Sequence, residues 1–232
     1  MEIVESEEEL YRYLKLAVSI SKEHPVLIDR YLNGKELEVD AVSDGTNVII
    51  PGILEHIERA GVHSGDSIAV YPAPSISAKE AETVAYYTTS ICRALGIRGV
   101  VNIQYVIYKG QVYVLEVNPR GSRTLPLLSK VTGVPLVELA VRAMLGESLR
   151  DNPYGLGLLP NKPYFAVKAP VFSFAKLKNV EVLLGPEMRS TGEVLGVGLD
   201  LKTAVCKALL GAGLALKKER KVLATQNGEI LP

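Results

Sequence analysis

The segment from Glu116 to Arg123 reads Glu-Val-Asn-Pro-Arg-Gly-Ser-Arg and combines two kinds of polar chemistry in eight residues. On a β-strand, residues two apart project from the same face, so Glu116 and Asn118 could hold one hard cation together. Pro119 would end the strand. Arg120 and Arg123 then offer two planar, permanently charged donors that suit phosphate or carboxylate oxygens. The segment predicts a site for a metal ion and a polyanion, and a solvated surface strand is the ordinary alternative.

The residues before this segment predict its partner strand. Apolar and polar side chains alternate over residues 101–107 and 112–117, which is typical of a β-hairpin. A hairpin loop of odd length, with Gly110 at positive φ, would place Gln104 opposite Glu116 on the same face. A loop of two residues would place the two side chains on opposite faces. The metal-site hypothesis therefore requires the odd-length loop.

Three oxygen ligands would then share one side of the hairpin, from Gln104, Glu116 and Asn118. No cysteine or histidine stands among them. An oxygen-only set favours Mg²⁺ or Mn²⁺ over zinc or copper, and Mg²⁺ takes further oxygens from water and substrate phosphates.

Composition predicts a globular protein without a nucleic-acid or membrane partner. The 232 residues are 47% hydrophobic and 22% charged, and 26 basic residues balance 26 acidic ones. The N-terminus lacks the basic and apolar regions of a signal peptide, and the longest apolar stretch, near residues 208–216, is too short to cross a bilayer. We expect a cytoplasmic protein in which Cys92 and Cys206 are buried free thiols.

Periodicity and turn signals predict an α+β protein. Ser6 with Glu9, and Ser77 with Glu80, are typical capping boxes before helices. Strands and turns alternate over residues 26–50 and indicate an antiparallel meander. The expected strands are 26–32, 37–41, 47–50, 164–171 and 222–225, and the expected helices are 6–22, 77–95, 135–145 and 204–215.

Several other polar residues are weaker candidates. A catalytic triad within residues 61–67 is unfavourable, because adjacent side chains in a short loop rarely align; the loop could instead offer His63 and Ser64 to a nucleotide, or be a plain turn. Glu36 begins a strand at an open place, whereas Glu38 and Asp40 read as its solvated face. Lys168 and Arg189 are further polar points that could equally be surface residues. No GxxxxGK[ST] phosphate loop is present.

Taken together, these segments resemble the large chain of carbamoyl-phosphate synthetase, an ATP-grasp ligase. The resemblance rests on residues 25–29, 55–67, 116–123, 129–135 and 184–194. The sequence Gly185-Pro186-Glu187-Met188 is similar to that of the second, C-terminal synthetase unit of that family.

The resemblance implies an α+β, ATP-grasp fold, with helices packed on an antiparallel sheet and truncated at its N-terminus. It implies a partial ATP-grasp domain with the nucleotide and metal site at 1–150, a C-terminal extension of the synthetase unit at 151–220, and the start of a regulatory domain at 221–232. The preceding domain and the Gly-rich lid would then lie outside the chain, which is expected to be inactive on its own.

The resemblance also implies an activity and its residues. The activity is the ATP- and Mg²⁺-dependent phosphorylation of carbamate to carbamoyl phosphate, for arginine and pyrimidine biosynthesis. The implied partners are the remainder of the large chain and a glutaminase small subunit. Arg120 and Arg123 would meet the carbamate or the transferred phosphoryl group. Gln104, Glu116 and Asn118 would hold Mg²⁺ or Mn²⁺. The remaining ATP contacts would come from Arg30, Leu32, Glu36, Gly61, Val62, His63, Ser64, Gln104 and Glu116.

Two alternatives stay open at this point. The chain could be a non-catalytic assembly fragment that folds and serves by docking. It could also be part of another ATP-grasp carboxylate ligase such as biotin carboxylase, which would share the metal-binding ribbon but would not explain residues 185–194.

Overall fold

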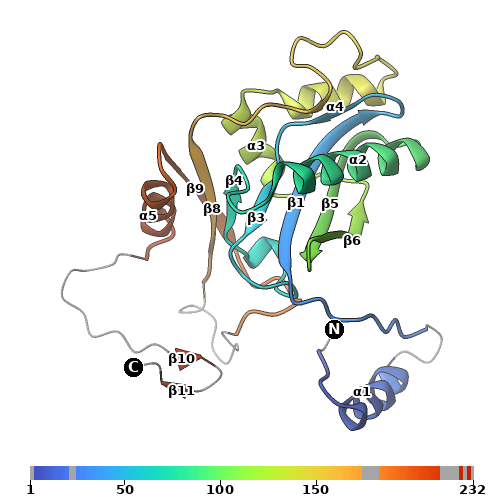
Figure 1. Ribbon diagram of the computed structural model, residues 1–232, viewed down its shortest axis with the longest axis vertical. Helices are drawn as coiled ribbons and strands as arrows, with labels where there is room; N and C mark the ends of the chain where they lie inside the picture. Colours follow the sequence, from blue (N-terminus) through green and yellow to red (C-terminus); the bar gives the residue numbers. More distant parts are fainter. Residues whose placement is uncertain (1–2, 21–24, 174–182, 215–224, 227–228, 231–232) are drawn as a thin grey trace.

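A nine-stranded sheet forms the centre of the protein. The computed structural model describes residues 3–20, 25–173, 183–214, 225–226 and 229–230 (Figure 1). The main path of the sheet runs β6-β5-β1-β3-β4-β8-β9, with β2 paired to β1 and β7 to β2. Every pairing is antiparallel except β2 with β7. The strands are β1 (Lys35–Asp44), β2 (Val48–Ile50), β3 (Leu54–His56), β4 (Ala69–Tyr71), β5 (Arg98–Tyr108), β6 (Gln111–Asn118), β7 (Gly157–Leu158), β8 (Phe165–Val171) and β9 (Gly192–Gly198), and β10 (Thr225–Gln226) pairs separately with β11 (Glu229–Ile230).

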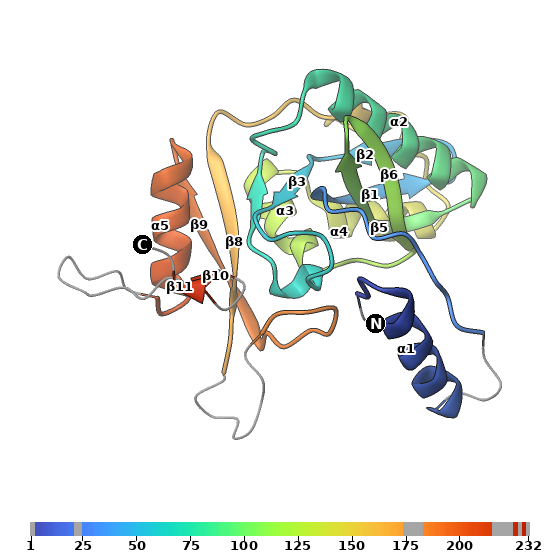
Figure 2. The ribbon, with the colours of Figure 1, turned by 60° about the horizontal axis from the view of Figure 1, so that its bottom comes forward.

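Helices cover both faces of this sheet (Figures 1 and 2). One core lies between the sheet and α2, a second lies between the opposite face and the pair α3 and α4, and a third joins α5 to β8 and β9. Helix α1 lies apart from the sheet. The expected α+β class with an antiparallel sheet and packed helices is therefore confirmed. The helices are α1 (Glu7–Ile20), α2 (Ala78–Ala94), α3 (Thr124–Thr132), α4 (Leu136–Met144) and α5 (Leu201–Gly211), with a 3-10 turn η1 (Ser64–Asp66).

Strand β1 is buried on both faces. Its residues Leu37 and Val39 point into the core under α2. Glu38 and Asp40 lie on the opposite face and are only 2% and 0% exposed. The expectation that these two acids form a solvated face was wrong, because side chains of the adjacent strands contact Glu38 and the segment leading into α3 covers Asp40.

The hairpin of β5 and β6 has a loop of two residues, so the odd-length loop was wrong. Lys109 and Gly110 both have positive φ, 51° and 74°, and join Tyr108 directly to its partner Gln111. The parity is changed elsewhere, by a β-bulge at Leu115. Without the bulge, a two-residue loop would pair Gln104 with Leu115, whereas the observed pairing is Gln104 with Glu116. The extra residue in β6, and not an extra residue in the loop, therefore places Gln104 opposite Glu116.

Several expected elements differ from the structure. Residues 25–34 form no strand, so the strand at 26–32 was wrong. Strands β3, β4 and β9 and helix α3 were not assigned from the sequence, because the first two are three residues long and Gly-rich β9 lacks clear alternation. Residues 21–24, where the first helix was expected to end, and 222–224 of the last expected strand lie outside the described residues.

Local signals were reliable where they are strong. In α2, Ser77 Oγ accepts a hydrogen bond from the Glu80 backbone N–H at 3.3 Å, and Glu80 Oε2 accepts one from the Ser77 N–H at 2.7 Å. This is the predicted capping box. Both cysteines are free as expected, but Cys206 is exposed while Cys92 is buried.

No single helix in the described part of the chain is long and apolar enough to cross a membrane. The bent pair α3 and α4, which meets at 111°, reaches the required length and hydropathy only when the two helices are taken together. Its apolar side chains supply much of the core on that face of the sheet.

Gly196 allows α5 to pack directly on β9, and its replacement tests that packing. A Cβ at this position would meet the Ala204 carbonyl oxygen at 2.2 Å, so Gly196→Ala should force the helix away and destabilise the protein by about 1–3 kcal/mol. Gly185→Ala is the control, because a Cβ there meets nothing within 4 Å. Urea unfolding measures both variants, and equal stabilities would contradict the close packing.

Asp44 fastens the end of β1 to a distant segment. It is buried, and its carboxylate accepts backbone hydrogen bonds from Asn47 and Leu149, both at 2.7 Å. Burial alone would raise the pKa of Asp44, but these bonds and those from the Asn47 side chain and the Thr46 backbone hold it well below its usual range. The resulting stabilisation is present above the pKa of the unfolded chain, near 4, and is lost as the pH falls.

We therefore expect Asp44→Asn to lower the free energy of unfolding by about 2 kcal/mol at pH 7. The loss should shrink at pH 3, because the wild-type carboxylate is then losing the same stabilisation. Urea titrations of both proteins at the two pH values give the measurement. A difference that does not change with pH would show that the charge of Asp44 is irrelevant.

Candidate functional site

An open cleft of about 470 Å³ collects most of the polar chemistry that the sequence indicates. Its walls come from β1, the η1 turn, the β5–β6 hairpin, the segment leading into α3, strand β8 and the loop before β9. It is lined by Glu38, His63, Ser64, Gly65, Asn102, Gln104, Glu116, Arg120, Gly121, Ser122, Arg123, Thr124, Lys168 and Met188.

The hairpin brings the three expected metal ligands together. Gln104 Nε2 and Asn118 Nδ2 each donate a hydrogen bond to Glu116 Oε1 at 2.8 Å. Rotating the two side-chain amides about their terminal bonds would turn both oxygens toward the same place, because amide oxygen and nitrogen occupy equivalent positions. One carboxylate and two amide oxygens then fit a hard cation whose other ligands are water and phosphate. No group of three His, Cys, Asp or Glu suited to a metal occurs among the described residues.

The two arginines stand at the other wall, on a segment that a buried carboxylate holds in place. Ser122 Oγ donates to Asp40 Oδ2 at 2.6 Å and its backbone N–H donates to Oδ1 at 3.3 Å, while the Thr124 hydroxyl also donates to Oδ2. Arg123 Nη1 donates to Ser190 Oγ at 3.2 Å. Asp40 thus fixes the residues on each side of Arg123, and the loop before β9 contacts its guanidinium.

The pKa of Asp40 is raised in this position. Burial and the neighbouring charge of Glu38 raise the pKa of Asp40 to about 6, although the hydrogen bonds from Ser122, Thr124 and Asn102 oppose the rise. Near neutral pH the group is mostly ionised, so it accepts these bonds as a carboxylate. It needs no bound ligand to hold the arginine segment.

In the loop at residues 61–67, the side chains of His63 and Asp66 accept hydrogen bonds from backbone N–H groups and do not form a triad with Ser64. His63 Nδ1 accepts a hydrogen bond from the Gly65 N–H at 3.0 Å, and the Asp66 carboxylate accepts the N–H groups of Arg189 and Ser190, each at 2.8 Å. Asp66 therefore fastens the loop before β9 to this turn. Ser64 faces the cleft, where its Oγ accepts from Gln104 Nε2 at 3.2 Å.

A buried histidine links the two acids of β1 beside the cleft. His56 Nε2 lies 3.3 Å from Glu38 Oε2, and Nδ1 lies 3.4 Å from Glu36 Oε1. Burial alone would lower the pKa of His56, but its interactions with Glu36 and Glu38 raise it to about 9. A charged imidazolium between two carboxylates offsets part of the cost of burying their charges.

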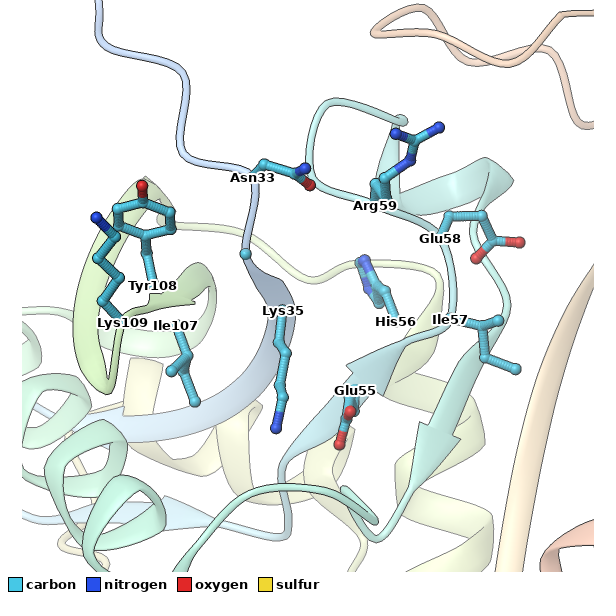
Figure 3. Close-up of a pocket in the computed structure, with 11 residues that line it drawn as sticks. Asn33, Lys35, Glu55, His56, Ile57, Glu58, Arg59, Ile107, Tyr108 and Lys109 are labelled. Carbon is cyan, nitrogen blue, oxygen red and sulfur yellow. The ribbon is translucent and has the colours of Figure 1, made fainter. Parts of the chain in front are cut away.

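His56 also borders a second cavity, of about 530 Å³, at the start of β1. Figure 3 shows its ring among the residues that line this cavity, with Asn33 and Arg59 above it, Lys35 to its left and Glu55 below it. Charges of both signs line the space. The predicted nucleotide residue Glu36 does not line this cavity, but its carboxylate contacts His56, which does.

The structure brings some predicted site residues to the cleft and leaves others outside it. His63, Ser64, Gln104, Glu116, Arg120 and Arg123 line the cleft. The other predicted nucleotide residues line neither cavity: Arg30 and Gly61 are exposed, Leu32 and Val62 are half-buried, and Glu36 is buried. The two segments are nevertheless neighbours, because the Tyr31 hydroxyl donates to the Ala60 carbonyl at 2.8 Å.

Eight lining residues were not assigned to the site from the sequence: Glu38, Gly65, Asn102, Gly121, Ser122, Thr124, Lys168 and Met188. Asn102 Nδ2 donates to Glu38 Oε1 at 2.8 Å, and the pKa of buried Glu38 is lowered because His56, Lys168 and Asn102 together outweigh its desolvation. One sequence signal existed for Lys168, a charged residue inside the otherwise apolar strand Phe165–Val171.

Two solved structures share this architecture. A biotin carboxylase from Campylobacter jejuni, described as a β,γ-ATP complex, matches 75% of the chain and 39% of its own length with a TM-score of 0.57 at 19% identity. A pyruvate carboxylase variant from Rhizobium etli matches 67% of the chain and 18% of its own length with a TM-score of 0.51 at 18% identity. These likenesses concern the fold alone, and they confirm the ATP-grasp class.

Sequence comparison gives the family. Residues 1–152 match the family described as carbamoyl-phosphate synthase L chain, ATP binding domain. The carbamoyl phosphate synthase large chain of Thermoanaerobacter sp. (strain X514) is 55% identical over 223 residues, which cover 96% of the chain and 21% of that relative. The chain thus spans about a fifth of the length of this relative. It belongs to the carbamoyl-phosphate synthase large-chain family.

Proposed function

We propose that this chain supplies the metal- and phosphate-binding wall of a site that phosphorylates carbamate with ATP to give carbamoyl phosphate. The observation that carries the proposal is the arrangement of one cleft, with Gln104 and Glu116 on one wall and Arg120 and Arg123 on the other. Such a cleft can hold a metal-bound polyphosphate with its transferable group facing the arginines. Membership of the family supports this reaction rather than that of another ATP-grasp ligase.

The nucleotide would lie along the segments beside the cleft. Arg30, Leu32 and Glu36 would line the adenine and ribose pocket, and the loop from Gly61 to Ser64 would complete it. The Tyr31–Ala60 hydrogen bond supports this placement, since it keeps both segments adjacent. Ser64 supports it further, because its contact with Gln104 joins the loop to the metal-binding hairpin.

In this reaction the chain would position the reactants and neutralise the charge of their phosphate oxygens. Gln104, Glu116 and Asn118 would hold Mg²⁺ or Mn²⁺, which withdraws charge from the phosphate oxygens when it is bound. A carbamate oxygen attacks the γ-phosphorus, the bond to the β-phosphate oxygen breaks, and ADP leaves. Arg120 and Arg123 stabilise the oxygens of the group in transfer, so no covalent enzyme intermediate is needed.

The exposure of the cleft bears on activity. Glu116, Arg120 and Arg123 are all exposed in this chain. Exposed ion contacts contribute about 1 kcal/mol or less each, and exclusion of water strengthens them. We therefore expect this chain alone to be inactive and to need the remainder of a large chain. A glutaminase small subunit, roles in arginine and pyrimidine biosynthesis and a cytoplasmic location are parts of the same proposal.

Glu116→Gln tests the metal site directly. The substitution keeps the shape of the side chain but removes the only carboxylate among the three ligands, so Mn²⁺ affinity in the presence of ATP should fall at least tenfold. Electron paramagnetic resonance titration of free Mn²⁺ measures it. Glu138→Gln, which changes an exposed carboxylate on α4, is the matched control. Equal Mn²⁺ affinity in the wild type and Glu116→Gln would remove Glu116 from the site.

Asp40→Asn tests whether a buried carboxylate supports the arginine wall. The folded-state pKa of about 6 lies above that of an unfolded aspartate, so the folded chain binds this proton more tightly and its stability falls as the pH rises from about 4 to about 6. The stability of the wild type relative to Asp40→Asn should therefore decrease by about 2 kcal/mol between pH 4 and pH 7.

The measurement combines urea unfolding with the Ser122 amide resonance, which should titrate near pH 6 in the wild type and stay constant in Asp40→Asn. A Ser122 resonance that titrates equally in both proteins would mean that another group controls the segment.

A further inference from the structure

Lys168 is a buried lysine on the floor of the cleft. It lies in the middle of β8 between the core residues Val167 and Ala169, and its residue is 1% exposed. Its Nζ donates to the Ser64 backbone carbonyl at 2.7 Å. No carboxylate of the described residues lies within 4.0 Å of this ammonium group. Strand β8 thus carries a positive charge into the cleft without a direct counter-ion.

An ammonium group in this position has unused capacity. Lysine has three N–H donors, and a single acceptor, the Ser64 carbonyl, contacts Nζ within the described residues. Burying a charge without a paired partner is costly, so an oxyanion that accepted from the remaining donors would offset that cost. The remaining donors face a cleft whose other residues include Glu116, Arg120 and Arg123.

Two buried or half-buried acids, Glu38 and Glu193, interact electrostatically with Lys168, and Glu193 also interacts with Arg123. Glu193 on β9 is influenced by both Lys168 and Arg123; burial raises its pKa, and the two cations oppose the rise. Glu193 Oε2 is buried and has no hydrogen-bond partner in the described part of the chain. Glu193 therefore offsets the charge of both cations at a distance and occupies the donors of neither.

Like Lys168, Arg120 and Arg123 have N–H donors that no acidic side chain of the described residues occupies. Arg120 Nη1 contacts only its neighbouring backbone, the Gly121 carbonyl, at 3.2 Å, and Arg123 contacts the Ser190 hydroxyl. No salt bridge to either arginine forms within the described residues. Three cations from two distant parts of the chain therefore meet at one cleft with donors to spare.

We propose that Lys168 is a third cationic ligand of the substrate, and donates from the floor of the cleft to an oxygen of the phosphoryl or carboxylate group that Arg120 and Arg123 contact. The assignment rests on the proposed function and adds a residue to it. The shared ligand chemistry is a small oxyanion. Ser64 fixes the position of the Lys168 ammonium group. Its backbone carbonyl accepts from Lys168 Nζ and its hydroxyl contacts Gln104, so Ser64 alone bridges Lys168 and the hairpin proposed to bind the metal.

The test is titration of the ¹⁵N-labelled chain with inorganic phosphate, and separately with bicarbonate, followed by the Ser64, Gly65 and Ser122 amide resonances. Lys168→Met should weaken the binding of at least one anion tenfold or more, and the anion that is weakened identifies the oxygens contacted. Lys168→Arg, which keeps a charged donor, should stay within about threefold of the wild type.

Lys207→Met is the matched control. Lys207 Nζ also donates to a backbone carbonyl, that of Val197 at 2.8 Å, but it lies on exposed α5 away from the cleft, and its removal should leave both affinities unchanged. Lys168→Met with wild-type affinity for both anions would overturn the proposal, as would a wild-type chain that binds neither.

Two further measurements cover the case in which Lys168→Met does not fold and separate this proposal from the proposed function. If Lys168→Met does not fold, the Cε resonance of Lys168 in ¹³C-lysine-labelled wild type, assigned through Lys168→Arg, must move on anion addition, and a resonance that stays in place overturns the proposal. Mn²⁺–ATP binding that depends on Glu116 reports on the proposed function separately. If Glu116-dependent Mn²⁺–ATP binding is observed and Lys168→Met keeps the wild-type anion affinities, the role of Lys168 is refuted while the proposed function stands.

Discussion

The polar side of the cleft depends on a face of β1 that carries acids into the protein interior. Glu36, Glu38 and Asp40 are almost fully buried, and such carboxylates stay ionised only if each finds donors. His56 lies between the first two, and the Ser122 and Thr124 hydroxyls bond to the third. These contacts join β3 and the arginine segment to β1. The requirement to satisfy buried acids thus positions groups that are far apart in the sequence.

Register makes the second contribution. The β5–β6 hairpin closes through a two-residue turn, which alone would turn Glu116 away from Gln104, and the bulge at Leu115 restores the shared face. Bulges occur often next to functional sites because they re-aim side chains without changing the sheet. Here the bulge lies directly beside Glu116, so the strand that carries Glu116 and Asn118 also contains the irregularity that orients them.

The charges in the cleft are separated by element. The carboxylates of Glu116 and Glu38 come from β6 and β1, whereas the cations come from the segment before α3 and from β8. A cation held by the hairpin and an anion held by the arginines would then attract each other across a short space, as phosphoryl transfer requires. Asp66 completes the arrangement, because it ties the turn that carries Ser64 to the loop that contacts Arg123. The positions of the functional groups therefore depend on contacts among loops as well as on strands.

The sequence by itself determined the α+β class, the capped helix α2 and the long hairpin, since these depend on periodicity and on residues close together in the chain. It also placed Glu116 and Asn118 close to two arginines, because all four lie within eight residues. It also indicated the family. Tertiary structure alone decided that Glu38 and Asp40 are buried, because strand alternation identifies a polar face but not what covers it. It decided that a bulge sets the register, since an extra residue in a strand leaves no local compositional mark. It also decided that Lys168 enters the cleft, because 45 residues separate it from Arg123 and only the antiparallel order of the sheet brings β8 beside the turn at Ser64.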